Sequence, residues 1–345
     1  MDCRDIERVI KTIVGTTCGV CTDNTSANQG AWKILEAKFP TKFFYGCVSH
    51  GLRLLVKSIF APPKTKRGSA VATYPEGYPF ATLAQFTINC REVVSFFHNS
   101  HALKARLEKE QSNMKLPFLV SPAPTRWGII GQCFRHLLLS EKIIYSIVNA
   151  RDFVIGPKKH RQIRQNIKEL VSDMNFVDTL RKCLLIISPI DKWITIFQND
   201  GVPVSEVYHA FTNLPDDFRA IANLTETELQ YLCHVTDERF NFMYGDAHGV
   251  AYLLDPKYVG EGISDVLFKR KLEDFIISFP VDDVNTARES HKEQLYQEIT
   301  DYTISAQSEK DARTFRFKML ESRKKTPMQY WLTDGCRWRA LKSSQ

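Results

Sequence analysis

The sequence predicts a small α/β segment of order β-α-β-α, followed by a much larger and almost wholly helical region. Residues 13–22, IVGTTCGVCT, are uncharged and rich in β-branched side chains and cysteine, which is typical of a strand buried on both faces. Residues 61–80 hold four prolines and two glycines and mark a boundary in the chain. Beyond this boundary, apolar residues recur at helical spacing.

The first helix is predicted from residue 26 to Pro40. Ser26, followed three residues later by Gln29, is a capping-box signature, and Pro40 ends the apolar spacing that follows. Asp23 and Asn24 fill the turn between the strand and this helix.

A second strand is predicted over residues 43–47, FFYGC. The helix after it has apolar residues at i, i+3, i+4, i+7 and i+8, namely Leu52, Leu55, Val56, Ile59 and Phe60. The alternation predicts two parallel strands joined by a right-handed crossover. Asp23 would then lie at the carboxyl end of its strand, where α/β sheets usually place their sites.

Four segments are predicted along the chain: the α/β segment 1–60, a proline-rich linker 61–81, a helical domain 82–325 and a C-terminal tail 326–345. The helical domain contains one long predicted helix over residues 127–148. Further helices are predicted at 158–175, 176–198, 226–243, 264–278, 286–306 and 308–323.

The composition indicates a soluble globular chain of 345 residues, of which 43% are hydrophobic. A net charge of +7 permits a polyanionic partner without requiring one. A charged N-terminal segment and the lack of a long apolar run disfavour secretion and a membrane partner. The nine scattered cysteines suit reduced thiols in the nucleus or cytoplasm. Cys18 and Cys21 are interpreted as small core residues of the first strand.

Asp23 is a candidate metal ligand. A carboxylate at a strand end, just before a helix N-terminus, can hold a divalent cation against a phosphate. The alternative is that Asp23 and Asn24 only turn and cap the chain.

Cys47 and His50 form a C-x-x-H pair at the exit of the second strand. A structural zinc ion needs four ligands, and His98 and His101 could supply the other two. Nothing in the spacing brings the two pairs together, so ordinary helix-end histidines are the alternative.

Two basic runs are candidates for contacting a nucleic-acid backbone. The first contains Lys158, Lys159, Arg161, Arg164 and Lys168, mostly on one helical face. The second spans residues 313–325 and leads toward Trp331 and Trp338, whose rings could stack on bases. The alternative for each run is a solvated helix face.

Taken in order, five segments resemble hAT-superfamily DNA transposases, in which a large helical insertion interrupts a ribonuclease-H-like catalytic core. The segments are CTDNTSANQGAWKILEAKFP (21–40), FFYGCVSHGLRLLVKSI (43–59), VVSFFHNSHALKARL (93–107), PAPTRWGII (122–130) and AHGVAYLLDPKY (247–258). The resemblance covers about residues 5–335 and implies that segment 1–60 is a partial ribonuclease-H-like core.

In that family, two aspartates and one glutamate bind the metal ions used for strand cleavage and transfer. Asp23 matches the second aspartate, and Cys47 and His50 match a C-x-x-H pair near the active site. Trp127 matches a tryptophan that stacks on a displaced base, with Arg126 beside it. Mg²⁺ or Mn²⁺ would be the cofactor if any activity remains.

The other two acids of the family pattern have no match here. Asp2 and Asp5 lie too close to Asp23 for the strands that should separate them, and no glutamate follows Glu321. The resemblance therefore predicts a truncated, transposon-derived and catalytically incomplete protein that binds nucleic acid or protein, most naturally in the nucleus. Without further strands, the strand at 13–22 would have an unpaired edge that invites a partner.

Two alternatives remain open. One is an active transposase or nuclease that is completed by another chain, either in a homo-oligomer or by a chain that completes the sheet. The other is a non-enzymatic interaction module or a decayed open reading frame.

Overall fold

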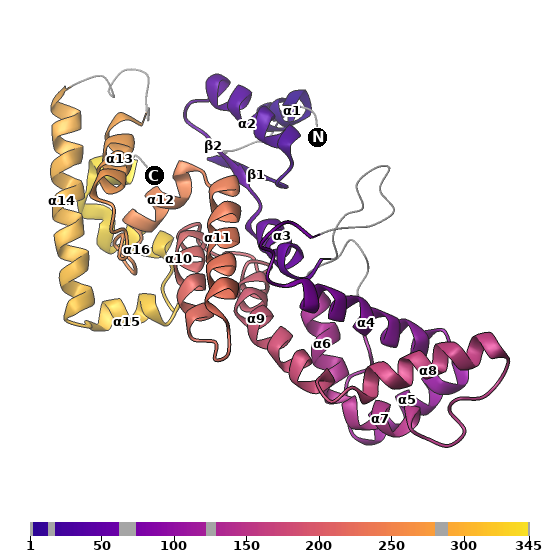
Figure 1. Ribbon diagram of the computed structural model, residues 1–345. Coiled ribbons are helices and arrows are strands. Elements are labelled where there is room, and N and C mark those ends of the chain that lie inside the picture. The colour runs from indigo at the N-terminus through magenta and orange to yellow at the C-terminus, as the bar shows by residue number, and fades with distance from the viewer. Residues whose placement is uncertain (1–2, 13–17, 62–73, 122–128, 280–288, 344–345) are drawn as a thin grey trace. The chain divides into compact units, whose positions relative to one another are not determined.

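The structure is a computed structural model of the chain and describes residues 3–12, 18–61, 74–121, 129–279 and 289–343. It is mostly helical and contains a two-stranded parallel sheet (Figure 1). The predicted combination of a small α/β part with a larger helical part is therefore confirmed.

Residue contacts divide the chain into two compact units. The first comprises Met1–Gly51, Asn199–Asn213 and Phe240–Gln345, and the second comprises Leu52–Gln198 and Leu214–Arg239. The domain limits predicted from the sequence differ from this division and remain predictions.

The first unit contains the sheet and the N- and C-terminal helices of the described chain. Its elements are α1 (Cys3–Thr12), β1 (Gly19–Thr22), α2 (Ser26–Lys38), β2 (Phe43–Gly46), α12 (Asp246–Leu254), α13 (Val266–Ser278), α14 (Glu289–Asp311), α15 (Phe315–Glu321), α16 (Pro327–Leu332), the 3-10 helix η2 (Asp334–Arg337) and α17 (Arg339–Ser343). Three further helices contribute residues to both units: α3 (Val48–Phe60), α10 (Ser205–Arg219) and α11 (Glu226–Met243).

The sheet pairs β1 with β2 in parallel, with Gly19 opposite Phe43 and Thr22 opposite Gly46. Because α2 connects the two strands and α3 follows them, the predicted β-α-β-α order is confirmed. One sheet face packs on α1 and α2 through Ile6, Ile10, Ala31, Trp32, Leu35 and Phe44. The residues that point the other way, among them Tyr45, line a mainly apolar cavity of about 520 Å³ together with α12 and α16.

The first strand differs from its prediction. Within the described residues it spans only Gly19–Thr22, and residues 13–17 lie outside them. The interpretation of Cys18 and Cys21 as core residues is wrong, because both are exposed and the rest of β1 is half-buried. In the part of the chain that the structure describes, β1 is therefore not buried on both faces.

The start of α2 also differs from its prediction by one residue. The N-cap is Thr25 rather than Ser26, and its hydroxyl accepts a hydrogen bond from the backbone N–H of Asn28 at 3.3 Å. The end of the helix, at Lys38 just before Pro40, is as expected from the loss of a backbone donor at proline.

A second core of the first unit is built around aromatic rings. Tyr302 is fully buried, and its ring centroid lies 5.0 Å from that of Trp331 and 5.3 Å from that of Trp338. The Trp331 indole donates a hydrogen bond of 3.1 Å to the carbonyl of Leu254. The interpretation of Trp331 and Trp338 as rings available for stacking on bases is therefore wrong, since both are core residues.

The second unit is built from helices alone in its described residues: α4 (Ala81–His98), α5 (His101–Asn113), α6 (Ile130–Leu139), α7 (Glu141–Val148), α8 (Lys158–Ser172) and α9 (Phe176–Ile196). The predicted long helix over residues 127–148 is wrong, because α6 and α7 are separated at Ser140. The Ser140 hydroxyl is buried and accepts a hydrogen bond of 2.8 Å from the Gln111 side chain of α5, which holds the break in place.

Candidate functional site

The carboxyl ends of β1 and β2 carry the predicted acidic site. Asp23 follows β1 directly and its side chain is exposed. The buried Asn28 of α2 donates from its amide to the Asp23 carboxylate and, at 3.1 Å, to the Asp23 carbonyl. Asp23 is therefore a restrained surface carboxylate at the N-terminal end of α2, where the helix dipole favours negative charge.

Asn24 ties the two strand ends together. Its amide nitrogen donates a hydrogen bond of 3.0 Å to the carbonyl of Cys47, and the residue is only 6% exposed. A side chain at Gly46 would collide with the Asn24 amide oxygen, so this position requires glycine. The Asn24 oxygen has no hydrogen-bond partner among the described residues.

Cys21 lies within β1 and Cys47 directly after β2, at the same end of the sheet. The Cys21 thiol and the backbone N–H groups of His50 and Ser49, in the first turn of α3, favour the thiolate form of Cys47. These donors hold the pKa of Cys47 well below its usual range, although burial acts in the opposite direction. The pKa of Cys21 is raised, chiefly by its interaction with Cys47.

The described residues contain no group of three or more His, Cys, Asp or Glu side chains that could hold a metal ion. Two-metal phosphoryl transfer needs carboxylates from separate elements around ions that are about 4 Å apart. The described part of this chain does not assemble such a centre at Asp23, nor a zinc site at Cys47 and His50. His98 instead makes a 3.2 Å hydrogen bond with the carbonyl of Leu119.

The first basic run lies on α8 of the second unit. Lys158, Lys159 and Arg161 are exposed, and no ion pair to them is found in the described chain. Arg164 is half-buried, donates a 2.7 Å hydrogen bond to the carbonyl of Phe153 and lies over the Phe153 ring at 5.7 Å. Of the five basic residues predicted for this run, three are thus presented to solvent, while Arg164 and Lys168 are half-buried.

The second basic run forms ion pairs within the protein. Its ion pairs are Arg313 with Glu321 at 2.7 Å, Arg323 with Glu206 at 3.2 Å and Lys325 with Asp334 at 2.6 Å. Because acidic partners already neutralise much of its charge, this run is a poorer surface for phosphate than α8.

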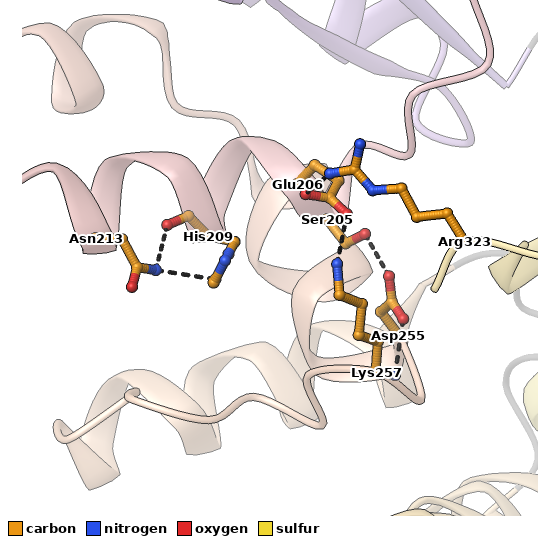
Figure 2. A network of polar contacts seen from close by, with 7 residues as sticks. All are labelled: Ser205, Glu206, His209, Asn213, Asp255, Lys257 and Arg323. Atoms are coloured by element: carbon orange, nitrogen blue, oxygen red, sulfur yellow. Dashed lines mark hydrogen bonds and ion pairs between the residues drawn. The ribbon is translucent and has the colours of Figure 1, made fainter. Parts of the chain in front are cut away.

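A buried polar network lies between α10, the turn after α12 and the segment after α15 (Figure 2). The Glu206 side chain is only 4% exposed and lies 2.9 Å from Lys257 and 3.2 Å from Arg323. Burial alone would raise the pKa of Glu206, but the two cations outweigh it and lower that pKa. Asp255 accepts a 2.5 Å hydrogen bond from the Ser205 hydroxyl, and its pKa is raised because it is buried.

The charges in this network are paired with one another, so its role is to join three chain segments. The sequence alone does not predict this network. The only local signal is the charged pair Asp255 and Lys257 within an otherwise apolar stretch, and the contact between Glu206 and Arg323 spans 117 positions.

Two predicted site residues, Arg126 and Trp127, lie outside the described residues. None of the described helices combines the length and apolar character needed to cross a bilayer. Comparison with known protein families and with curated proteins finds no match. The likeness to hAT transposases therefore depends on the sequence motifs alone.

Proposed function

We propose that this chain is a nucleic-acid-binding protein of the nucleus, derived from a hAT-type transposase, that holds DNA without cutting it unaided. In this proposal the β1-α2-β2-α3 segment is part of a ribonuclease-H-like core, and α8 belongs to the helical insertion. The observation that carries the proposal is the basic group at the start of α8, which is exposed and has no ion pair among the described residues.

The position of this group argues against a purely structural role. Cations near a helix N-terminus oppose the helix dipole and cost about 0.3–1 kcal/mol each. The first turn of α8 contains no acidic residue to compensate Lys158 and Lys159. The same helix end presents free backbone N–H groups, and a phosphate placed there would meet both the N–H groups and the ammonium groups.

The proposed lack of DNA cleavage is argued from the surroundings of Asp23. This carboxylate is exposed and restrained, but the described residues supply no further ligands in a cluster with it. A single carboxylate can hold a hydrated Mg²⁺ weakly, whereas phosphoryl transfer needs both the attacking and the leaving oxygen to be stabilised.

The test is the salt dependence of binding to a labelled DNA duplex, measured by fluorescence anisotropy. The variant K158Q/K159Q/R161Q removes three exposed cations from α8. Each lost phosphate contact lowers the slope of log affinity against log salt by about 0.9, so a loss of up to about 2.7 is expected.

A matched control removes the same charge elsewhere. The variant K269Q/R270Q/K271Q takes three cations from α13 of the first unit and should leave the slope nearly unchanged. If both variants lower the affinity equally, net charge rather than α8 is responsible. Absent or salt-independent binding by the wild type would contradict the proposal as a whole.

One observation favours a second candidate, an active core that is completed by another chain. In the part of the chain that the structure describes, the sheet contains only β1 and β2, so each strand offers one edge to a further strand. Amide hydrogen exchange tests this second candidate. Strong protection of the backbone amides of residues 19–22 in a proven monomer would contradict the addition of a strand by a partner.

A further inference from the structure

The cavity on the sheet face that points away from α1 and α2 is not used by the proposed function. It lies within the first unit and has a volume of about 520 Å³. Gly19, Phe43 and Tyr45 of the sheet form one wall, α12 and α16 form two others, and the segment that leads into α10 lines a fourth side. Small-molecule sites in proteins have volumes of about 300–1,000 Å³, so this cavity has the size of such a site.

Phe43, Tyr45 and Trp331 supply the aromatic part of the lining, and a neighbour holds each ring in place. The Phe43 ring stacks on that of Phe279, with 5.1 Å between the centroids, and the Tyr45 ring lies edge-on to that of His248 at 4.9 Å. The Trp331 indole donates its hydrogen bond to a backbone carbonyl. The cavity is therefore pre-formed, and its rings suit an apolar body or an organic cation.

Asp255 is the acidic residue of the lining and is only 3% exposed. Its carboxylate accepts hydrogen bonds from two neutral donors, the Ser205 hydroxyl at 2.5 Å and the backbone N–H of Lys257 at 2.9 Å (Figure 2). No ion pair to Asp255 is found in the described chain, because the Lys257 ammonium lies 2.9 Å from Glu206 instead. A buried carboxylate is stabilised by a cation, and two accepted hydrogen bonds leave lone pairs on Asp255 for one.

The rest of the lining brings no positive charge into the cavity. The described residues that line it include no lysine, arginine or histidine. Lys257 and Arg323 do not line it and both contact Glu206, and the Arg323 side chain is 54% exposed, so solvent screens its charge. An anion in the cavity would meet Asp255 without a counter-charge, whereas a cation would meet both a carboxylate and aromatic rings.

From this lining we infer that the cavity binds a small organic cation, namely a protonated amine with an aromatic or other apolar body. The ammonium group pairs with Asp255, and the apolar body lies against the sheet, α12 and α16. The inference does not rest on the proposed function, because the basic group of α8 belongs to the second unit.

The experiment compares three naphthalene probes that differ only in the head group at one ring position. Naphthylmethylamine is a cation at neutral pH, naphthylmethanol is neutral and naphthoate is an anion. Their affinities for the full-length protein are measured by isothermal titration calorimetry without DNA. The amine should bind about 10-fold more tightly than the alcohol, because a charge-assisted hydrogen bond is stronger than a neutral one, and naphthoate should bind more weakly than either. Equal affinities for the amine and the alcohol would overturn the inference.

Two variants test the role of charge. Asp255→Asn keeps the shape of the side chain and should remove the preference for the amine over the alcohol. Met328→Lys places a cation in the lining at a position that is 73% exposed, so the fold should tolerate it. This variant should weaken binding of the amine about 5-fold and leave binding of the alcohol nearly unchanged. Met174→Lys is the matched control, because Met174 is 90% exposed in the second unit, and it should change neither affinity.

A third variant tests the place of binding. Ala251 lines the cavity from α12, so Ala251→Trp fills the space and should abolish binding of both the amine and the alcohol. Urea midpoints establish that each variant is folded, and if Asp255→Asn is not, the comparison of Met328→Lys with Met174→Lys decides. The inference is overturned if folded Asp255→Asn keeps the wild-type preference for the amine, if Met328→Lys and Met174→Lys act alike, or if folded Ala251→Trp still binds the amine.

Discussion

Replacing Asp191 with asparagine is expected to stabilise the second unit at neutral pH. Asp191 lies on α9 and is packed against α6, where a side chain at Gly131 would collide with its carboxylate. Burial raises the pKa of Asp191 to about 6, and the attraction of Arg135 offsets this only in part. The charged form is therefore less stable in the folded protein than in the unfolded chain.

The sign of the pH dependence follows from this shift. The ordinary pKa of the group is 3.8, so between pH 4 and 6 the folded protein binds more protons at Asp191 than the unfolded chain does. The free energy of unfolding falls as the pH rises through this window and stays low above it. At about 1.4 kcal/mol per pKa unit, and allowing for partial solvation, the penalty at pH 7.5 is about 2 kcal/mol.

This penalty is measured by urea unfolding at pH 4 and pH 7.5, and amide hydrogen exchange in α6 and α9 serves as the local probe. Asp191→Asn should gain about 2 kcal/mol at pH 7.5 and almost nothing at pH 4. Asp178→Asn is the matched control on the same helix, because Asp178 is exposed and pairs with Arg181 at 2.9 Å; it should change stability by less than about 0.5 kcal/mol. An equal effect of Asp191→Asn at both pH values would refute the reasoning.

Two further predictions concern the first unit. Glu206→Gln leaves Lys257 and Arg323 without their shared carboxylate, so the free energy of unfolding should drop by about 3 kcal/mol in urea titrations, and an unchanged midpoint would show that water solvates the pair. Trp338→Ala removes a buried ring and should cost about 3–5 kcal/mol, while the DNA affinity per folded molecule stays the same. A selective loss of DNA affinity in this variant would instead indicate base stacking by Trp338.

The strongly periodic parts of the chain were predictable from the sequence. The stripe that begins at Leu52 lies on a helix with a continuous apolar face, and this helix is present as α3. Local spacing is enough there because the buried face of a helix repeats along its own sequence.

Features that depend on tertiary contacts were not predictable in the same way. The uncharged sequence around Cys21 has the composition of a central strand, but the described strand β1 lies in a two-stranded sheet in which Cys21 is exposed. The break at Ser140 depends on Gln111, which lies on another helix. The ion pairs of the second basic run could not be predicted, because its acidic partners, such as Glu206, are distant in the sequence.

The candidate site was predictable in its position more than in its contacts. The placement of Asp23 and Cys47 at neighbouring strand ends followed from the β-α-β order and is confirmed by the strand register. The contribution of Asn24 and Asn28, which tie the turn to Cys47 and hold the Asp23 carboxylate, required the folded structure.

The most direct test of DNA binding without cleavage measures bound DNA and cleaved DNA in the same sample. The wild type and Asp23→Ala are incubated with end-labelled duplex DNA in Mg²⁺ or Mn²⁺, and bound and cleaved DNA are resolved on native and denaturing gels. We predict that both proteins bind equally well and that neither cuts. Metal-dependent cleavage by the wild type that disappears in Asp23→Ala would contradict this account.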